Sequence, residues 1–329
     1  MKFKSILITG GTGSFGKAFV KNLIKTRKDL KRLVIFSRDE WKQSEMAKDY
    51  PTSKFPFIRF FLGDVRDYER LKRAVKDIEV IVHAAALKQV PAAEYNPIEF
   101  VKTNIIGAQN IIEASIEQNI KKVVALSTDK AAAPLNLYGA TKLCSDKLFI
   151  AANNYSGKNI FSVCRYGNVM GTRGSVIPLF LEQAKKGIIT VTDKNMTRFN
   201  ITLEESIDLV LYAIKNSLGN EIFIPKIPSY NIMDLAKSIG EKCKIKISGI
   251  RPGEKIHEEM ITTNDSFNTI ESSKYYIILP SLPAEKIKKY LKYYNAKKIN
   301  KSFSYNSKDN KKFLSVKEIK NLIQKNISL

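Results

Sequence analysis

The segment Ile6-Leu7-Ile8-Thr9-Gly10-Gly11-Thr12-Gly13-Ser14-Phe15-Gly16 decides the fold of this 329-residue chain. A short apolar run leads into glycines at the spacing Gly-x-x-Gly-x-x-Gly, and an amphipathic run containing Phe19, Val20, Leu23 and Ile24 follows. Glycines permit a tight turn and let the backbone approach a pyrophosphate at a helix N-terminus. The segment therefore predicts the first strand, turn and helix of a dinucleotide-binding fold.

Outward from this turn, strand-like and helix-like segments alternate to about Arg165. Such alternation predicts an α/β fold, a Rossmann-type doubly wound parallel sheet with right-handed crossovers. We expect an NADP-binding domain at residues 1–165 that also receives about 195–225, because Thr202 to Leu218 has the pattern of a helix that returns to the sheet. Residues 166–329 are expected to form mainly a smaller α/β substrate domain. Its basic tail starts near residue 296 and has a predicted helix at Val316–Ile327.

Residues that follow successive predicted strands make up the expected cofactor site. In the glycine turn they are Gly10, Thr12, Gly13, Ser14, Phe15 and Gly16. The second strand, Arg32 to Phe36, ends in Ser37-Arg38-Asp39, and we expect Ser37, Arg38 and Lys42 to hold the 2′-phosphate of NADP. The alternative is that Asp39 binds the ribose 2′-hydroxyl of NAD.

Later strand ends extend this site. We expect Asp64 to accept a hydrogen bond from adenine and Val65 to pack on its ring. Small side chains at Ala84, Ala85 and Ala86 let a flat cofactor lie close to the backbone, and Lys88 is placed to meet a phosphate or a substrate oxygen. Further predicted cofactor contacts are Tyr166, Asn168, Val169 and Asn104. Asn104 is also a candidate for bracing the catalytic strand. We interpret His83 as a core residue.

The stretch Ser127-Thr128-Asp129-Lys130, followed by Tyr138 and Lys142, carries the predicted chemistry. Tyr138 and Lys142 lie one turn apart on a predicted helix, so we expect the lysine charge to lower the tyrosine pKa. A tyrosinate accepts a proton from a sugar hydroxyl, as nicotinamide-dependent alcohol oxidation requires. A surface ion pair is the alternative interpretation of Asp129 and Lys130.

From Ile6 to about Glu259 the chain resembles the extended short-chain dehydrogenase/reductases. Nucleotide-sugar 4,6-dehydratases of this superfamily have Thr-Asp-Glu after the catalytic strand. Here Thr128-Asp129-Lys130, with Ala131 to Gly139, resembles the inverting UDP-N-acetylglucosamine 4,6-dehydratases. The resemblance implies a lyase that uses NADP without net redox, with Asp129 as acid, Lys130 as base and Tyr138 with Lys142 for the hydride steps.

A lysine acts as a base only when neutral, so we expect the pKa of Lys130 to be lowered by several units, by Lys142, the positive nicotinamide and burial. The resemblance also implies that Asn168 and Arg251, in Arg251-Pro252-Gly253-Glu254-Lys255, contact the nucleotide-sugar diphosphate; Arg198 is a further candidate. It implies UDP-N-acetylglucosamine as substrate, a homo-oligomer, and a product that feeds pseudaminic acid for flagella or the cell surface.

Composition bounds these expectations. The net charge is +23, but the lysines are spread along the chain without a nucleic-acid motif, so no nucleic-acid partner is expected. Three cysteines without paired spacing indicate a reducing cytoplasm and no metal site. We also expect no signal peptide and no membrane span. Two alternatives remain. A nucleotide-sugar 4-epimerase would keep Tyr138 and Lys142 without needing the Asp129–Lys130 pair. A non-enzymatic NADP-binding protein would need neither.

Overall fold

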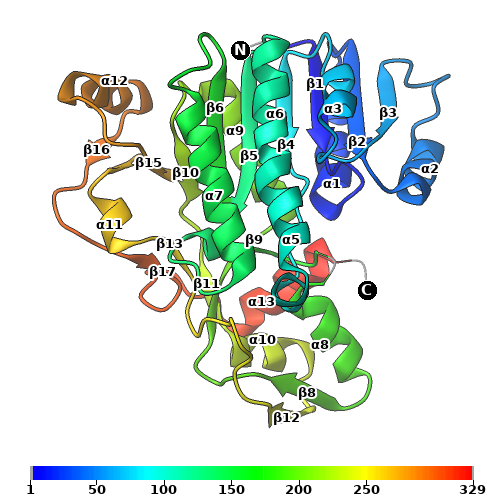
Figure 1. The fold of residues 1–329 in the computed structure, drawn as a ribbon. Helices are drawn as coiled ribbons and strands as arrows, with labels where there is room; N and C mark the ends of the chain where they lie inside the picture. Colours follow the sequence, from blue (N-terminus) through cyan, green and yellow to red (C-terminus); the bar gives the residue numbers. More distant parts are fainter. Residues whose placement is uncertain (1–2, 173, 328–329) are drawn as a thin grey trace.

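A ten-stranded sheet dominates the computed structural model, which describes residues 3–172 and 174–327 (Figure 1). In that part of the chain the strand order is β16-β14-β15-β10-β6-β5-β4-β1-β2-β3. The parallel strands are β1 (Ser5–Thr9), β2 (Arg32–Ser37), β3 (Ile58–Leu62), β4 (Val80–His83), β5 (Lys122–Thr128), β6 (Ile160–Tyr166) and β10 (Ile222–Pro225). Strand order reverses between β1 and β4, and in doubly wound sheets ligands bind beyond the carboxyl ends at this point.

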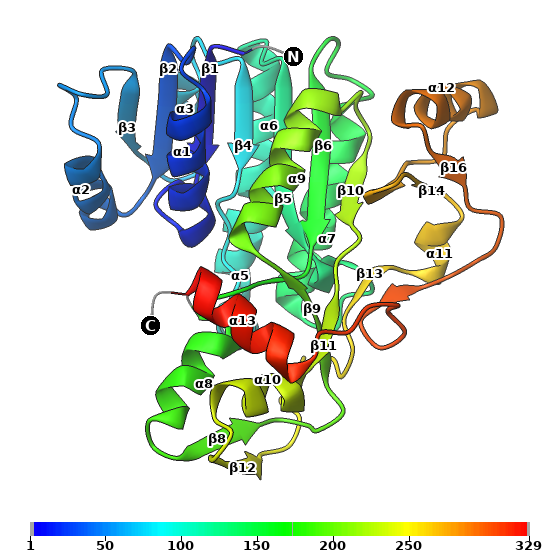
Figure 2. The same cartoon turned by 180° about the vertical axis from the view of Figure 1, so that it is seen from behind.

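Helices cover both faces of the sheet, as the Rossmann prediction required. One face carries α3 (Tyr68–Ala74), α6 (Gly107–Glu117) and α7 (Leu137–Ala152). The opposite face carries α1 (Ser14–Thr26) and α9 (Leu203–Asn216), which pack on one another (Figure 2). Helix α2 (Glu40–Asp49) follows β2 near the β3 edge. The fold class predicted from the sequence is confirmed.

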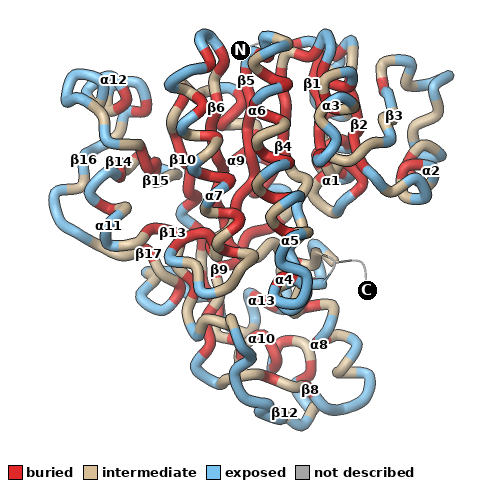
Figure 3. The backbone as a smooth tube through the Cα atoms, in the orientation of Figure 1, coloured by how far each residue is buried: buried red, intermediate tan, exposed pale blue. Residues whose placement is uncertain are grey.

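The parallel strands other than the edge strand β3 are almost entirely buried, and Figure 3 shows the burial concentrated along them. Every residue of β1 is buried, as is every residue of β4. Strands enclosed on both sides favour continuous apolar runs over alternating ones. The larger hydrophobic core therefore forms between the sheet and its two helical layers.

A smaller part lies below the carboxyl ends of these strands in Figure 1 and has its own hydrophobic core. It contains α8 (Val176–Ala184), α10 (Ile232–Ile239), α13 (Val316–Asn326) and the parallel pair β8 (Ile188–Val191) and β12 (Lys244–Ile247). A three-stranded sheet, formed by β7 (Asn168–Val169), β9 (Thr197–Ile201) and β11 (Ser229–Asn231), lies between the two parts.

The remaining elements are short, apart from α12. They are α4 (Val90–Tyr95), α5 (Pro97–Phe100), the π-helical turn η1 (Val101–Ile106), the 3₁₀ turn η2 (Asp129–Ala131), α11 (Thr263–Ser266), α12 (Ala284–Tyr294), β13 (Glu259–Ile261) and β17 (Tyr305–Asn306).

The expected domain boundaries differ from the structure in two ways. Strand β10 and helix α9 join the large sheet, but β9, also inside the expected 195–225 insertion, joins the three-stranded sheet. The large sheet also gains β14 (Thr269–Glu271), β15 (Tyr275–Ile278) and β16 (Lys297–Lys298) through antiparallel pairing, although the sequence analysis placed them mainly with the substrate domain. Strands of two to four residues leave too little pattern to be assigned from sequence.

The predicted last helix is confirmed as α13, one residue shorter than expected. Its Ile319 and Ile323 are buried in the smaller core, and α13 packs on α10 (Figure 2). The basic tail thus completes the smaller part. Among the described residues, no helix combines the length and the apolar character needed to cross a bilayer.

Candidate active site

A cavity of about 1290 Å³ lies at the carboxyl ends of the parallel strands, between the sheet and the smaller part. Almost all residues predicted from the sequence line it. They are Gly10, Thr12, Gly13, Ser14, Phe15, Gly16, Ser37, Arg38, Asp39, Lys42, Asp64, Val65, Ala84, Ala85, Ala86, Lys88, Thr128, Lys130, Tyr138, Lys142, Tyr166, Asn168, Val169, Arg198 and Arg251. Asp129 and Asn104 lie just behind this lining. The tertiary structure therefore brings together side chains from most of the chain.

The glycine turn forms a backbone cradle at one end of the cavity. Gly10 has φ +65°, and a Cβ there would lie 2.9 Å from the Ala85 nitrogen. A Cβ on Gly16 would lie 2.4 Å from the Gly11 oxygen, so α1 can pack this closely only through glycine. Gly13 is the N-cap of α1 and provides no side-chain cap. Helix amides without a side-chain partner suit a pyrophosphate, so the cradle fits a dinucleotide.

Side chains after β2 are held by their neighbours. Ser37 accepts a hydrogen bond from the Thr12 hydroxyl at 3.1 Å. Asp39 caps α2 by accepting from the Lys42 amide at 2.9 Å, and it also pairs with the Lys42 ammonium. Both interactions involve the Asp39 carboxylate. A ribose hydroxyl of NAD would therefore have to compete with Lys42 for this group.

Arg38 projects into the cavity mouth beside Asp64. The Arg38 Nη1 to Asp64 Oδ2 distance is 3.7 Å, and Arg66 Nη2 binds the same oxygen at 2.8 Å. Partial burial opposes ionisation of Asp64, but hydrogen bonds and charge from Arg66, followed by the charge of Arg38, lower its pKa. Asp64 therefore stays anionic, and Arg38 retains donors for an anionic ligand.

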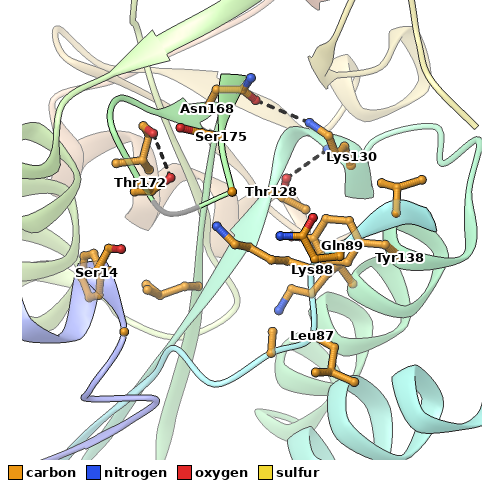
Figure 4. Close-up of a pocket in the computed structure, with 18 of the residues that line it drawn as sticks. Ser14, Leu87, Lys88, Gln89, Thr128, Lys130, Tyr138, Asn168, Thr172 and Ser175 are labelled. Carbon is orange, nitrogen blue, oxygen red and sulfur yellow. Dashed lines mark hydrogen bonds between the residues drawn. The ribbon is translucent and has the colours of Figure 1, made fainter. Parts of the chain in front are cut away.

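The candidate catalytic stretch, Thr128 to Lys130, lies where β5 ends, and Tyr138 lies at the start of α7. The Thr128 hydroxyl accepts from the Lys130 amide at 3.3 Å and so caps the η2 turn. Asn136 caps α7 by accepting from the Gly139 amide at 2.8 Å. A Cβ on Gly139 would lie 2.2 Å from the Lys130 carbonyl oxygen, so only glycine lets α7 press on η2. This packing places Tyr138 next to Thr128 and Lys130 (Figure 4).

Asp129 is fully buried, and this decides its protonation. Its Oδ1 accepts from the Thr128 hydroxyl at 3.0 Å and from Lys130 Nζ at 3.1 Å. Its Oδ2 is buried without a hydrogen-bond partner among the described residues. Burial raises the pKa of Asp129, the charge of Lys130 opposes this, and the charge of Glu258 adds to it. Asp129 is therefore suited to hold and donate a proton.

Lys130 lies between two carboxylates. Its Nζ is 3.1 Å from Asp129 Oδ1, 2.9 Å from Glu258 Oε1 and 3.4 Å from Asn168 Oδ1 (Figure 4 shows the contact with Asn168). Burial lowers the pKa of Lys130, but the charges of Asp129 and Glu258 outweigh it and raise the pKa above its ordinary value. The expectation of a lowered Lys130 pKa is therefore wrong for the charges within the protein, because the adjacent Asp129 and the distant Glu258 both raise this pKa.

The tyrosine-lysine pair also differs from expectation. Burial raises the pKa of Tyr138 to about 12, and the main opposing effects are the charge of Lys130 and a hydrogen bond with Thr128. Lys130, rather than Lys142, is thus the principal lysine acting on Tyr138. Burial lowers the pKa of Lys142 itself, opposed by Asp146.

Several cations from different elements line the cavity: Arg198 from β9, Arg251 from the loop after β12 and Lys88 from the loop after β4. Arg198 donates from Nη1 to the Thr197 oxygen at 2.8 Å and to the Ile256 oxygen at 3.0 Å, while its Nε faces Glu258. Arg251 is 59% exposed at the rim. Burial, followed by the charge of Lys130, lowers the pKa of Lys88. This distribution of cations suits a diphosphate that spans the cavity.

Asn104 has a positioning role. Its Oδ1 accepts from the Leu87 amide at 2.9 Å, and its Nδ2 donates to the Leu87 oxygen at 2.9 Å and to Thr141 Oγ1 at 3.0 Å. The side-chain amide of Asn104 is thus engaged by Leu87 and Thr141, and Asn104 lies outside the cavity lining. The expected direct cofactor contact is corrected to a brace between α7 and the loop after β4.

Two other details bear on the sequence analysis. His83 is a core residue, 1% exposed, with its Nδ1 2.9 Å from Thr9 Oγ1. Glu258 was not predicted as a site residue. It lies 128 positions beyond Lys130, in His257-Glu258-Glu259, and no sequence spacing indicates its contact with Lys130.

Comparison with known proteins agrees with this architecture. The family model described as "Polysaccharide biosynthesis protein" matches residues 6–280. A Campylobacter jejuni protein named "UDP-N-acetylglucosamine 4,6-dehydratase (inverting)" is 50% identical, covering 97% of both chains. A Rickettsia akari protein named "UDP-glucose 4-epimerase" is 40% identical, covering 97% of this chain and 95% of its own.

Among solved structures, that of Pen from Bacillus thuringiensis superposes with a TM-score of 0.89 at 39% identity, covering 99% of both chains. The family model covers most of the chain, and the two named relatives match it over 97% of its length at 40% identity or more. The chain therefore belongs to the polysaccharide biosynthesis protein family of extended short-chain dehydrogenase/reductases.

Proposed function

We propose that the chain is an NADP-dependent UDP-N-acetylglucosamine 4,6-dehydratase that inverts C5. The observation that carries the proposal is the buried Asp129–Lys130 pair beside Tyr138. Simple oxidation or 4-epimerisation needs Tyr138, but it has no use for a second acid and base. The similarity to the Campylobacter protein supports the same conclusion. The product would be UDP-2-acetamido-2,6-dideoxy-β-L-arabino-hex-4-ulose, which would feed pseudaminic acid synthesis.

The cofactor region is proposed to hold NADP. The pyrophosphate would lie on the Gly10–Gly16 cradle, and Arg38 with Lys42 would meet the 2′-phosphate. The engagement of Asp39 by α2 and Lys42 supports NADP over NAD. When bound, the nicotinamide supplies a hydride acceptor for C4 and later a hydride donor for C6.

The chain's own residues then move protons. Tyr138, once ionised, takes the C4 hydroxyl proton, and the resulting ketone acidifies the hydrogen at C5. Lys130, once neutral, removes that hydrogen, and Asp129 gives its proton to the departing C6 hydroxyl, which leaves as water. A proton from solvent then adds to C5 from the opposite face and inverts this carbon, while the proton taken up by Lys130 returns to Asp129, whose Oδ1 lies 3.1 Å from Nζ. The cofactor ends as it began, so the reaction is a hydro-lyase reaction.

The smaller part is proposed to bind the nucleotide. Arg251, from the loop after β12, lines the cavity together with Asn168, Arg198 and Lys88, and these side chains would contact the UDP diphosphate. Guanidinium groups bind phosphate oxygens in a bidentate manner. The partners we propose are thus UDP-N-acetylglucosamine and, as the resemblance implied, further copies of the chain.

The test is a proton NMR time course with UDP-N-acetylglucosamine in D₂O. We expect a new C6 methyl signal, deuterium at C5 and the inverted configuration. Lys130→Ala should abolish the C5 exchange, whereas Lys147→Ala, which removes an exposed lysine of α7, should not. Loss of exchange in both variants would contradict the role of Lys130.

A nucleotide-sugar 4-epimerase is the second candidate, because the Rickettsia relative carries that name. Formation of UDP-N-acetylgalactosamine without a methyl signal would establish it and refute the dehydratase.

A further inference from the structure

Glu258 is a buried carboxylate whose position is fixed by the backbone around it. It precedes β13, and its side chain is 3% exposed, yet it belongs to the cavity lining. The Glu258 amide donates to Ser307 Oγ at 2.9 Å, and its carbonyl accepts from the Ser307 amide at 2.7 Å. These bonds hold the carboxylate facing Lys130, with Oε1 2.9 Å from Nζ.

The second oxygen of this carboxylate distinguishes it from a purely structural ion pair. Glu258 Oε2 is buried and has no hydrogen-bond partner among the described residues. An unsatisfied buried acceptor is costly, so structural pairs normally use both oxygens or reach water. Such groups persist where function requires an unsolvated charge.

The charges around Lys130 show what Glu258 contributes. The carboxylates facing Lys130 are Asp129 from its own turn and Glu258; the cations are Lys88, Arg198 and Lys255; the hydroxyls are Tyr138 and Tyr230. Facing Glu258 are the cations Lys130, Arg198 and Lys255 and the carboxyl group of Asp129. If Asp129 holds a proton, Glu258 is the remaining carboxylate anion against Lys130 in this set.

We propose that Glu258 is a positioning residue for Lys130: it holds Nζ at the cavity wall and sets the pH range over which Lys130 can accept the C5 proton. The role in C5 chemistry rests on the proposed function, whereas the coupling of the two side chains does not. The direction of the pKa shifts agrees, since Glu258 raises the pKa of Lys130 and Lys130, followed by Arg198, lowers that of Glu258 against the effect of burial.

The test uses Glu258→Gln, which keeps the shape and an acceptor oxygen but removes the charge. An opposite charge in direct contact shifts a pKa by about 1–3 units. We therefore expect the acid limb of the kcat profile, measured by C5 deuterium exchange, to move about 1–3 pH units lower, with KM little changed. Glu258→Asp retains the charge at a longer distance, so its acid limb should move less.

The matched control is Glu259→Gln, because the neighbouring carboxylate accepts from Ser304 Oγ at 2.6 Å and lies outside the cavity lining. A second readout does not depend on turnover: the pH dependence of Lys130 acetylation, followed by peptide mass spectrometry. This reactivity should rise at lower pH in Glu258→Gln than in the parent chain and should be unchanged in Glu259→Gln.

The outcomes separate the two proposals. If the acetylation profile shifts but the parent chain makes no 4-keto-6-deoxy sugar, the proposed function fails and the coupling of Glu258 to Lys130 stands. If the parent chain makes the product and neither profile moves, the inference about Glu258 is overturned. Should Glu258→Gln fail to fold, the same profiles of Glu258→Asp decide, and unshifted profiles overturn it.

Discussion

Replacement of Arg38 by alanine tests the cofactor assignment most directly. Charge-assisted hydrogen bonds contribute about 1.5–3 kcal/mol each when buried. The Arg38 side chain is 54% exposed, so solvent screening reduces this, and we expect a total of about 2 kcal/mol. The dissociation constant for NADP⁺ should then rise roughly 30-fold, while that for NAD⁺ should change little.

The structure also indicates that Arg38→Ala leaves the fold intact. Asp64 keeps its pairing with Arg66 Nη2 at 2.8 Å, so no carboxylate is left without a partner. Isothermal titration of cofactor-stripped protein with NADP⁺ and with NAD⁺ gives both constants. Arg59→Ala is the control, because Arg59 bonds only to local carbonyls among the contacts described and lies outside the cavity lining.

The difference between the two cofactors should also fall as salt is added, since the interaction lies near the surface. An equal loss of affinity for NADP⁺ and NAD⁺ in Arg38→Ala would refute the 2′-phosphate assignment. Unchanged NADP⁺ affinity would refute it as well.

Three other perturbations have defined outcomes. Tyr138→Phe should lower kcat by about 10²–10⁴-fold with little change in KM, measured by the C6 methyl signal; a wild-type rate would exclude Tyr138 as the proton acceptor. Asp146→Asn should cost about 3 kcal/mol in the free energy of unfolding, measured with urea, because the buried Arg165 guanidinium loses its nearer anion at 3.1 Å and keeps only the partly exposed Asp265 at 3.6 Å; an unchanged midpoint would contradict this. Burial lowers the pKa of His83 to about 3 in the folded chain. In the unfolded chain His83 binds a proton already below about pH 6.5. The free energy of unfolding should therefore decrease by about 1.4 kcal/mol for each pH unit below about 6.5. The urea midpoint of His83→Gln should fall less between pH 6.5 and 4.5, and an equal fall would exclude His83 as a source.

Local sequence patterns were enough to predict many of the residues that line the cavity. The three glycines, the small residues after β4 and the Tyr138–Lys142 spacing each lie within one turn or one strand end. Their chemistry follows from backbone geometry that neighbouring residues impose. Parallel strands also bring their carboxyl ends to one edge of the sheet, so separate strand-end residues were predictable as one cavity.

Electrostatics at the site did not follow from local patterns. The pKa of Lys130 is raised by Asp129 and also by the distant Glu258, and the role of Asn104 depends on Leu87 and Thr141. Contacts over such separations arise from packing of distant elements, which leaves no spacing in the sequence. The very short strands β14 and β16 are likewise defined by their partners.

The sequence by itself determined the Rossmann architecture, and it marked the glycine turn and the candidates Asp129, Lys130 and Tyr138, because each of these features lies in contiguous residues. Only the tertiary structure decided that the C-terminal strands extend the sheet, that α13 completes the smaller core, and that Lys130 lies between two carboxylates. The physical reason is that burial and charge depend on what surrounds a group in space. For Lys130, that surrounding includes a residue 128 positions away.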